Sequence, residues 1–322
     1  MASVPSEYSI RDSTRPWSDR IGDAVLKWIT MAAALGAVVL LGAIVWKVLD
    51  LAWPAISKYG LSFITSDVWD PVKAEFGALS FIYGTAISSL LALIFAVPLA
   101  LAIALWLSEL APRGVRGVIG SLVEMLAAIP SVVLGLWGIL VLGPFLSHHL
   151  EPWLHEKLGF IPIFGAPEAT GTGMFTAALI LTIMVVPIIA SICRELFLQV
   201  PNELEEGALA LGATRWEMVR GVILPATRTG IAAAVILGLG RALGEAIAVT
   251  QVIGGGTRIT HNIFGPSDTI ASKIAASYQG AATALEQSSL LYLGALLLVI
   301  GLLTNFAAQI IVRRFDPLRG AR

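Results

Sequence analysis

The stretch E-G-A-L-A-L-G at residues 206–212 is followed, nine residues later, by V-I-L-P at residues 222–225. Both lie in an organised polar segment between two long apolar runs. Asn202 is placed to cap a helix here, with a glutamate three residues later as its capping-box partner. Gly212 is placed to end that helix in the left-handed conformation, and Pro225 is expected to break the chain before the next apolar run. We therefore predict a short helix that is tied closely to the apolar runs on both sides.

This predicted helix is amphipathic. Leu204, Ala208 and Leu211 recur at intervals of four and three residues, which places them on one face. Thr214 is placed to cap a second short helix that follows. An amphipathic helix can rest on lipid headgroups, but helices of that kind favour Lys and Arg on the polar face. The first turn here carries glutamates, which anionic lipid repels, so we favour a protein partner.

The composition of the whole chain is that of a membrane protein. Of its 322 residues, 57% are hydrophobic and 13% are charged, against about 25% charged in a typical soluble domain. So few charges cannot cover the surface of a soluble protein, and the mean hydropathy of +0.83 agrees. The composition also excludes a disordered chain and a nucleic-acid binder, and the lone Cys193 excludes an intrachain disulfide. The net charge of −1 indicates no bulk electrostatic partner.

Six apolar runs are each long enough to cross a bilayer, which takes about 20 residues. The chain is predicted to begin with a cytoplasmic tail at 1–27 and a first transmembrane helix at 28–53. The other five spans are predicted at about 84–107, 117–146, 170–194, 226–254 and 287–312. The expected fold class is therefore an all-α polytopic membrane protein with six transmembrane helices.

Lysine and arginine are distributed unevenly between the two sides of this topology. One side holds 14 of them and the other holds 5. Because positively charged loops stay in the cytoplasm, this bias puts both termini in the cytoplasm and the loop at 254–286 outside. The N-terminal tail is too long and too acidic for a signal peptide, so the first apolar run is expected to remain as an anchor.

Arg241 and Glu245 lie inside the fifth apolar run. Each costs about 2.5–3.5 kcal/mol at the centre of a bilayer, and residues four apart on a helix can pair. A neutralised structural pair is one interpretation. We favour a place in a substrate path, because intramembrane charges usually mark one and Arg before Glu is the weaker order for a helical pair. Gly240 and Gly244 form a small-xxx-small step, which predicts the close approach of another helix beside Arg241.

Pro130 is predicted to lie within the third span, followed by Ser131 and a glycine-rich helix. A proline inside a span frees a backbone carbonyl that must be satisfied internally or face a cavity, so we add Ser131 to the candidate substrate path. Three histidines at 148–155 lack a ligand-spacing motif, and we predict no metal site there. Glu124 is expected to reach the cytoplasmic interface or to pair with an arginine there.

Three segments resemble a known family. The stretch at 206–225 is similar to the EAA motif of ABC importer permeases, in which Glu-Ala-Ala precedes a Gly and an Ile-x-Leu-Pro at the spacing found here. Gly207 stands in place of the first Ala, and Val222 in place of Ile. The segments A-A-I-P-S-V-V-L-G-L-W-G at 127–138 and G-L-G-R-A-L-G-E-A-I-A-V at 238–249 resemble the third-helix and fifth-helix signatures of phosphate permeases.

The resemblance implies the type I ABC importer permease (MetI-like) architecture for a permease core at 77–315, with a cytoplasmic coupling loop at 201–225. In that family the loop docks on the ATP-binding subunit. The ATPase-coupling residues that the resemblance implies here are Glu206, Gly207, Ala208, Leu211, Gly212 and Pro225. The narrower resemblance, to phosphate permeases of the PstC type, implies a subunit that moves inorganic phosphate into the cytoplasm across a bacterial inner membrane.

No Gly-Lys dipeptide occurs in the sequence, so the chain has no Walker A motif. We expect a transport subunit in the lipid bilayer that has no catalytic residues, binds no cofactor and contacts no nucleic acid. The resemblance implies ATP and Mg on a partner ATPase dimer of the PstB type. It also implies a homologous second permease of the PstA type and an extracytoplasmic phosphate-binding protein of the PstS type.

Other functions fit the sequence less well. Sulfate or molybdate is an alternative substrate for the same class of importer. A proton-coupled secondary transporter that uses Glu245 is a second alternative, but such a protein has no use for the helix in the cytoplasmic loop. A membrane enzyme is disfavoured, because the sequence offers no evident Ser/His/Asp set or metal cluster.

Overall fold

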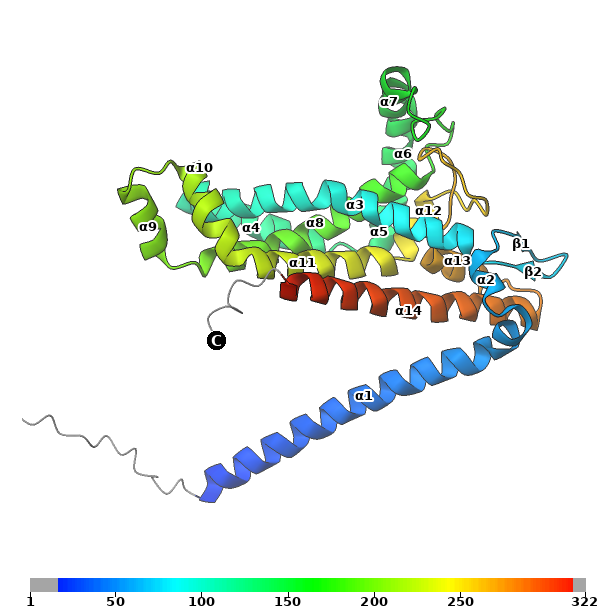
Figure 1. Cartoon of the computed structure of the whole chain (residues 1–322), viewed down its shortest axis with the longest axis horizontal. Coiled ribbons are helices and arrows are strands. Elements are labelled where there is room, and N and C mark those ends of the chain that lie inside the picture. Colours follow the sequence, from blue (N-terminus) through cyan, green and yellow to red (C-terminus); the bar gives the residue numbers. More distant parts are fainter. Residues whose placement is uncertain (1–16, 315–322) are drawn as a thin grey trace, which may run out of the picture. The chain divides into compact units, whose positions relative to one another are not determined.

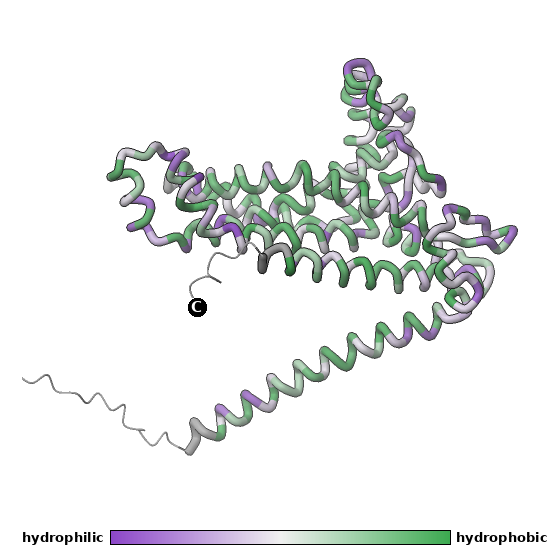
Figure 2. Tube along the Cα trace, in the orientation of Figure 1, coloured by the Kyte–Doolittle hydropathy of each residue, from purple (hydrophilic) through white to green (hydrophobic). Residues whose placement is uncertain are grey.

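The computed structural model describes residues 17–314. Most of the predicted tail and the last residue of the predicted core, Phe315, lie outside this range. Within it, six helical runs are long and apolar enough to cross a membrane: Ile21–Tyr59, Leu79–Leu110, Ser131–Leu158, Met174–Leu198, Arg215–Gly244 and Ala284–Ile310. This confirms the all-α fold class with six candidate spans, and Figure 2 shows the apolar residues running along these helices.

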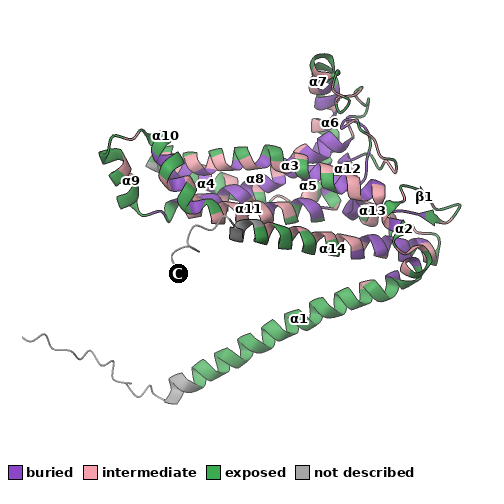
Figure 3. Cartoon of the chain, in the orientation of Figure 1, coloured by how far each residue is buried: buried purple, intermediate pink, exposed green. Residues whose placement is uncertain are grey.

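The first helix, α1 (Trp17–Tyr59), extends beyond both ends of the predicted span at 28–53. Lys47 and Asp50, inside the predicted span, pair at 2.9 Å and do not interrupt the helix. Residues up to Asp50 form a compact unit of their own, and Figure 3 shows this part of α1 exposed along its length. The following residues belong to the second unit, where Ala55 donates its backbone N–H to Ser288 Oγ at 2.9 Å.

A small polar cap precedes the second span. It consists of α2 (Ser62–Thr65) and an antiparallel hairpin of β1 (Trp69–Asp70) and β2 (Glu75–Phe76). The Trp69 and Phe76 rings pack edge to face at 4.8 Å between centroids, and Trp69 packs in the same way on Phe81 at 5.2 Å. The hairpin is therefore fixed to the start of the next helix through aromatic contacts.

The core of the second unit is built around α8 (Met174–Leu198), which packs against α3 (Leu79–Leu105) and α11 (Leu224–Gly244) (Figure 1). Ala92, Ala96, Ala100 and Ala104 on α3 recur every four residues and are fully buried. Such a stripe of small side chains lets two helix backbones approach closely without a hydrophobic driving force in lipid. The central helix is 72% buried over its most apolar window, against 22% for α14 (Ala284–Arg314).

The third predicted span, at 117–146, is wrong as a continuous helix. The chain forms α4 (Arg113–Ala127), stops, and begins α5 (Ser131–Trp137) immediately after Pro130, whose ψ of 135° is extended. Proline disfavours helical conformation in the residue before it, so it starts a helix here instead of kinking one. From α5 the helix runs on through η2 (Gly138–Leu142), α6 (Gly143–Phe145), η3 (Leu146–Leu150) and α7 (Glu151–Leu158).

The fifth predicted span, at 226–254, is interrupted at a different place from the one expected. Pro225 does not break the chain, because helix α10 (Arg215–Met218) continues through a π-helical turn, η4 (Val219–Ile223), into α11. Local π-helical adjustments can satisfy the backbone groups that a proline frees, so the helix continues through Pro225. The helix stops instead at Gly244, Glu245 is extended with ψ 118°, and a short helix, α12 (Ile247–Val252), follows.

The remaining predicted boundaries differ by a few residues. The second span begins at Leu79 and continues past α3 through a π-helical turn, η1 (Trp106–Leu110), and the fourth is α8. Between α12 and the last span, the chain forms α13 (Ile270–Ser277), which packs against α3, α12 and α14. Thr269 caps α13 in a reciprocal pair of hydrogen bonds with Ser272.

Candidate functional site

The break at Glu245 brings together the two predicted intramembrane charges. Arg241 Nη1, in the last turn of α11, lies 2.7 Å from Glu245 Oε2, as the spacing predicted. The other carboxylate oxygen, Glu245 Oε1, accepts a hydrogen bond from the backbone N–H of Ala248 at 3.1 Å. Glu245 therefore spans the break, holding the end of α11 with one oxygen and the first turn of α12 with the other.

The two charges differ in burial. Glu245 is 3% exposed, whereas the Arg241 side chain is 43% exposed. Both oxygens of the buried carboxylate are satisfied, as a buried charge requires. The arginine still has an accessible side, and a charge at this depth of a span must face protein or water. The chain thus presents guanidinium donors at a helix break, next to a counter-ion that is fixed in place.

The break at Pro130 lies against the same region, because α5 packs on α12. Two glycines, Gly135 of α5 and Gly138 at the start of η2, make this contact possible. A Cβ on Gly135 would lie 2.9 Å from Ala248 Cα, and one on Gly138 would lie 2.7 Å from Val252 Cγ1. Ser131 is the first residue of α5, but no hydrogen bond joins it to Arg241 or Glu245 among the residues that the structure describes. The fold therefore brings the segments at 127–138 and 238–249 together, although no hydrogen bond joins Ser131 to the ion pair among the described residues.

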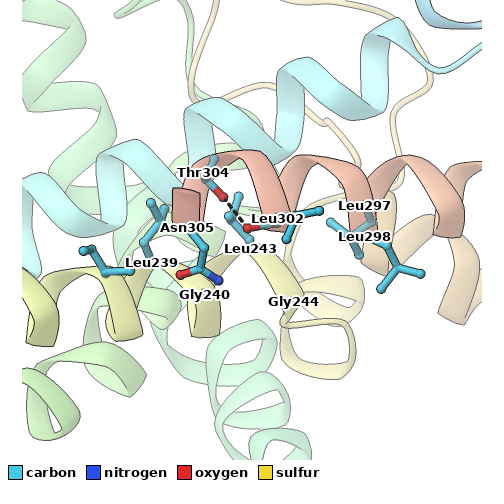
Figure 4. A pocket seen from close by; sticks show the side chains of 11 residues that line it. Leu239, Gly240, Leu243, Gly244, Leu297, Leu298, Leu302, Thr304 and Asn305 are labelled. Carbon is cyan, nitrogen blue, oxygen red and sulfur yellow. Dashed lines mark hydrogen bonds between the residues drawn. The ribbon is translucent and has the colours of Figure 1, made fainter. Parts of the chain in front are cut away.

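A groove of about 480 Å³ runs between α11 and α14 beside this break (Figure 4). Its lining includes Gly240 and Gly244, and a Cβ on either would meet no atom within 4 Å. The predicted close approach at this small-xxx-small step is therefore not made by any described helix of this chain. The tight contact of α11 falls at Gly238, where a Cβ would lie 2.8 Å from Val185 Cγ1 of α8. In Figure 4 the Asn305 side chain extends from α14 toward Gly240.

A second candidate site is the polar loop at 201–225, whose first helix is α9 (Asn202–Ala210). The predicted N-cap is wrong: Pro201 occupies the cap position, Asn202 is the first helical residue, and no side chain caps the helix. Proline fixes the backbone at the cap position, and its carbonyl accepts a hydrogen bond from Leu204 N–H at 3.0 Å. The stop at Gly212 is confirmed by its φ of +88°. The Thr214 cap is also confirmed, since Glu217 N–H donates to Thr214 Oγ1 at 3.3 Å and Thr214 N–H to Glu217 Oε2 at 2.8 Å.

The residues of the predicted apolar stripe of α9 differ in burial. Ala208 is half-buried and packs against the apolar cluster around Met218 and Val219. Leu204 is 53% exposed, and Leu211, just past the helix, is 92% exposed. Glu206, Gly207 and Pro225 are exposed too. The chain therefore anchors one side of α9 and leaves Leu204, Leu211, Glu203 and Glu206 uncovered.

Glu205 makes a contact that sequence reasoning missed. Its carboxyl hydrogen-bonds Glu109 in η1, and burial raises the pKa of Glu205, with the neighbouring Glu109 charge adding to the effect. Two carboxyls can share a hydrogen bond only when one of them carries a proton. Nothing in the sequence pattern pairs these residues, because they come from different elements far apart in the chain.

A buried polar cluster at the start of α13 was also missed. Asp268 is 4% exposed and accepts hydrogen bonds from the Ser272 hydroxyl and from Thr269 N–H. Burial raises the pKa of Asp268 to about 6. Lys273 Nζ lies 5.3 Å from the centre of the Trp69 ring, and burial lowers its pKa. The cluster joins α13 to the hairpin that precedes α3.

The weaker candidates take structural roles. Glu124 Oε1 lies 3.7 Å from Arg194 Nη1, one of the two outcomes expected for it. His149 Nδ1 is within hydrogen-bond distance of Phe145 O, and His155 Nδ1 of Phe164 O. Within residues 17–314, no three His, Cys, Asp or Glu side chains gather where a metal ion could sit.

Comparison with known sequences gives a family and close relatives. Residues 96–317 match the family described as binding-protein-dependent transport system inner membrane component. The chain is 43% identical to the phosphate transport system permease protein PstC of Mesorhizobium japonicum, over 99% of this chain and 98% of that protein. It is 41% identical to the protein of the same name from Haemophilus influenzae, over 92% of this chain and 95% of that protein.

Solved structures show the same fold. A chain of the bacterial alginate ABC transporter in complex with its alginate-bound periplasmic protein superposes with a TM-score of 0.63, covering 94% of this chain and 99% of that one, at 21% identity. A chain of the inward-facing MetNI methionine ABC transporter superposes with a TM-score of 0.53, covering 73% and 94%, at 20% identity. At these identities the likeness establishes the architecture alone, which is the MetI-like architecture expected from the sequence.

Proposed function

The chain belongs to the binding-protein-dependent transport system inner membrane component family, among its phosphate permeases of the PstC type, and we propose from this that it carries inorganic phosphate across the membrane as the permease subunit of an ATP-driven importer. One observation carries the substrate assignment. The segments that resemble phosphate-permease signatures, at 127–138 and 238–249, meet in the fold where α5 packs on α12, next to Arg241.

Such a permease is a transport subunit of a larger complex with an ATPase and a binding protein. We propose that this chain pairs with a PstA-type permease, a PstB-type ATPase dimer that holds ATP and Mg, and a PstS-type phosphate-binding protein. The exposed side chains of Leu204, Leu211, Glu203 and Glu206 support docking of the ATPase there. The excess of Lys and Arg on one side supports cytoplasmic termini in a bacterial inner membrane.

The proposed transport step uses the break at Glu245. α10, η4 and α11 form one helical run from Arg215 to Gly244, which can carry a movement of the docked loop to Arg241 without bending. An anion near the midplane needs a positive charge, and Arg241 offers paired donors to two of its oxygens. Glu245 keeps Arg241 oriented before the anion arrives. Ser131, at the start of α5, is proposed to line the same path.

The test is uptake by the purified complex in sealed vesicles that contain ATP. Phosphate should accumulate only with ATP and the binding protein present, and collapse of the proton gradient should leave the uptake unchanged. Preferential uptake of sulfate or molybdate would overturn the substrate assignment. Uptake that needs a proton gradient but no ATP would overturn the importer mechanism.

A further inference from the structure

Gln251 lies in α12, beside the contact between the two helix breaks. Its side-chain oxygen, Oε1, is buried and accepts no hydrogen bond from any described residue. Native proteins leave few buried polar atoms without a partner. A ligand that donates a hydrogen bond would satisfy this acceptor, which lies next to a candidate path for anions.

The position of this oxygen is set by Gly135 of α5. A Cβ on Gly135 would lie 2.8 Å from Gln251 Oε1 and 2.9 Å from Ala248 Cα, so these two atoms border the same point on α5. The backbone N–H of Ala248 is the donor to Glu245 Oε1, and Glu245 Oε2 holds Arg241. Arg241, Glu245 and Gln251 thus form a line of polar groups along the chain, in which Gln251 lies three residues after Ala248 and on the same face of α12.

The members of this line differ in what they can still bind. Both oxygens of Glu245 already accept from protein donors, Arg241 Nη1 and Ala248 N–H. Arg241 still has accessible donors, since its side chain is 43% exposed. Gln251 Oε1 is the acceptor in this line that has no donor among the described residues. Guanidinium donors together with a free acceptor fit a tetrahedral oxyanion that still carries a proton.

We propose that Gln251 is a specificity-determining residue of the anion path, whose carbonyl oxygen accepts a hydrogen bond from the hydroxyl group of protonated phosphate held by Arg241. The inference rests on the proposed function, and it adds the residue that distinguishes a protonated anion from an unprotonated one. Sulfate carries no proton at neutral pH, so it would leave the acceptor unpaired and bring an oxygen against it. Sites built to pair a substrate hydroxyl reject analogues that lack it far more strongly than apolar pockets do.

In the conformation described here, the backbone of Gly135 covers the oxygen. Both helices at this contact begin directly after a break, α5 after Pro130 and α12 after Glu245. They can therefore move apart without unwinding, and this separation exposes the Gln251 oxygen to the path. Phosphate therefore binds at Gln251 when α5 and α12 have moved apart.

The test compares uptake of phosphate, arsenate and sulfate by the complete complex in ATP-loaded vesicles. Gln251→Met keeps the shape of the side chain and removes the acceptor, and it should lower uptake of phosphate and of arsenate, which is also protonated, by about ten- to a hundredfold. It should also lose most of the preference over sulfate. Gln251→Glu keeps an acceptor and should keep the preference. Gln287→Met, the same change at an exposed position at the start of α14, should behave as wild type.

The outcomes separate this inference from the function on which it rests. A wild-type complex that takes up no phosphate overturns the proposed function. A wild-type complex that does so, with an unchanged anion preference in Gln251→Met, overturns the role of Gln251 alone. Equal loss of all three anions in both Gln251 variants would also overturn it, because a purely structural residue behaves that way. If Gln251→Met does not assemble, Gln251→Glu decides, and sulfate uptake equal to phosphate uptake in that variant contradicts the proposal.

Discussion

Arg241 and Glu245 are held at the end of a helix, where they can change partners more easily than within one. Glu245 has left the helical conformation, with ψ 118°, and its carboxylate replaces the backbone acceptor that α12 lacks at its start. Removing Arg241 alone would leave a carboxylate that is 3% exposed without its counter-ion, which is strongly destabilising. A single substitution would therefore mix a structural effect with a transport effect.

A neutral double variant separates the two roles. Arg241→Gln combined with Glu245→Gln keeps donors at position 241 and an acceptor on a side chain of unchanged length at position 245, and it removes both charges together. We expect normal assembly and a loss of phosphate uptake of at least about a hundredfold, because the anion then meets no positive charge in the low-dielectric midplane. Complex yield and vesicle uptake are the measurements. Wild-type uptake by the double variant would mean that the pair of Arg241 and Glu245 has a structural role only.

The stability of the polar cluster around Asp268 should depend on pH. Because the pKa of Asp268 is about 6 in the folded chain and 3.8 ordinarily, the folded state binds more protons between these values. The stability that the protonated carboxyl contributes is complete below pH 3.8 and is lost as the pH rises through 6. We expect the opening free energy of α13, measured by hydrogen exchange, to fall by about 1–2 kcal/mol from pH 5 to pH 7.

Asp268→Asn should remove this dependence, since the amide does not titrate over that range. Asp67→Asn, at an exposed position before the hairpin, is the matched control and should leave the wild-type dependence intact. An Asp268→Asn chain whose α13 still opens more easily at pH 7 than at pH 5 would assign the effect to another group. Lys273 and Glu286 are the charged groups that face Asp268 and its neighbours in this cluster.

The sequence could predict some of these residues because the relevant information is local. The pair of Arg241 and Glu245 follows from a spacing of four residues, and the Thr214 cap from its motif. Gln251 and Asp268 were missed, because what makes them unusual is burial against segments far away in the chain. Gly135, which covers the Gln251 oxygen, is more than 100 residues from it in the sequence.

Among the elements, hydropathy predicts how many helices cross the membrane but not where they break. Apolar residues resume directly after both Pro130 and Glu245, so a hydropathy window runs on past the ends of α4 and α11. The prolines themselves give opposite results: Pro130 precedes a new helix, whereas Pro225 lies inside a continuous one. The difference is the backbone on the N-terminal side, which is extended before α5 and already helical through η4 before α11.

The end of α9 depends on one residue in the left-handed conformation. Gly212 has φ +88°, and a Cβ there would meet no atom within 4 Å, so only backbone strain opposes a side chain. Gly212→Ala should cost about 1–2 kcal/mol locally and turn α9 away from its present direction, which should weaken binding of the ATPase. The measurement is the amount of ATPase that co-purifies with the permease.

Gly60 offers a control with the same backbone requirement. Its φ is +51°, its Cβ position is also open, and it lies between α1 and α2, far in sequence from the polar loop. Gly60→Ala should impose a similar strain and leave the yield of co-purified ATPase unchanged. If both variants lose the ATPase equally, the effect is general destabilisation. If neither does, α9 is not the docking helix.

Across the whole molecule, the distribution of burial indicates that the chain works in a complex. The most apolar windows of α11 and α14 are only 22% buried, and the groove between them contains the open glycines of the small-xxx-small step. Arg241 lies on the same helix as this uncovered surface, and a charge there cannot face lipid. We propose a second membrane subunit as the cover of this surface.

The orientation of the chain in the membrane is the remaining prediction, and the structure shows where to test it. Ser267 is 2% exposed and would not react in the folded state, but Val72, in the hairpin, is 96% exposed, and Leu211, after α9, is 92% exposed. The test uses a chain whose buried Cys193 is replaced by Ala. A cysteine at Val72 should react with an impermeant thiol reagent added to intact cells. A cysteine at Leu211 should react only after the membrane is opened. This pattern places the polar loop and both predicted cytoplasmic termini on the side where ATP is available, because an even number of spans returns the chain to the side where it began. The reverse pattern would put α9 outside the cell, where no ATPase could reach it, and the importer assignment would have to be abandoned along with the topology.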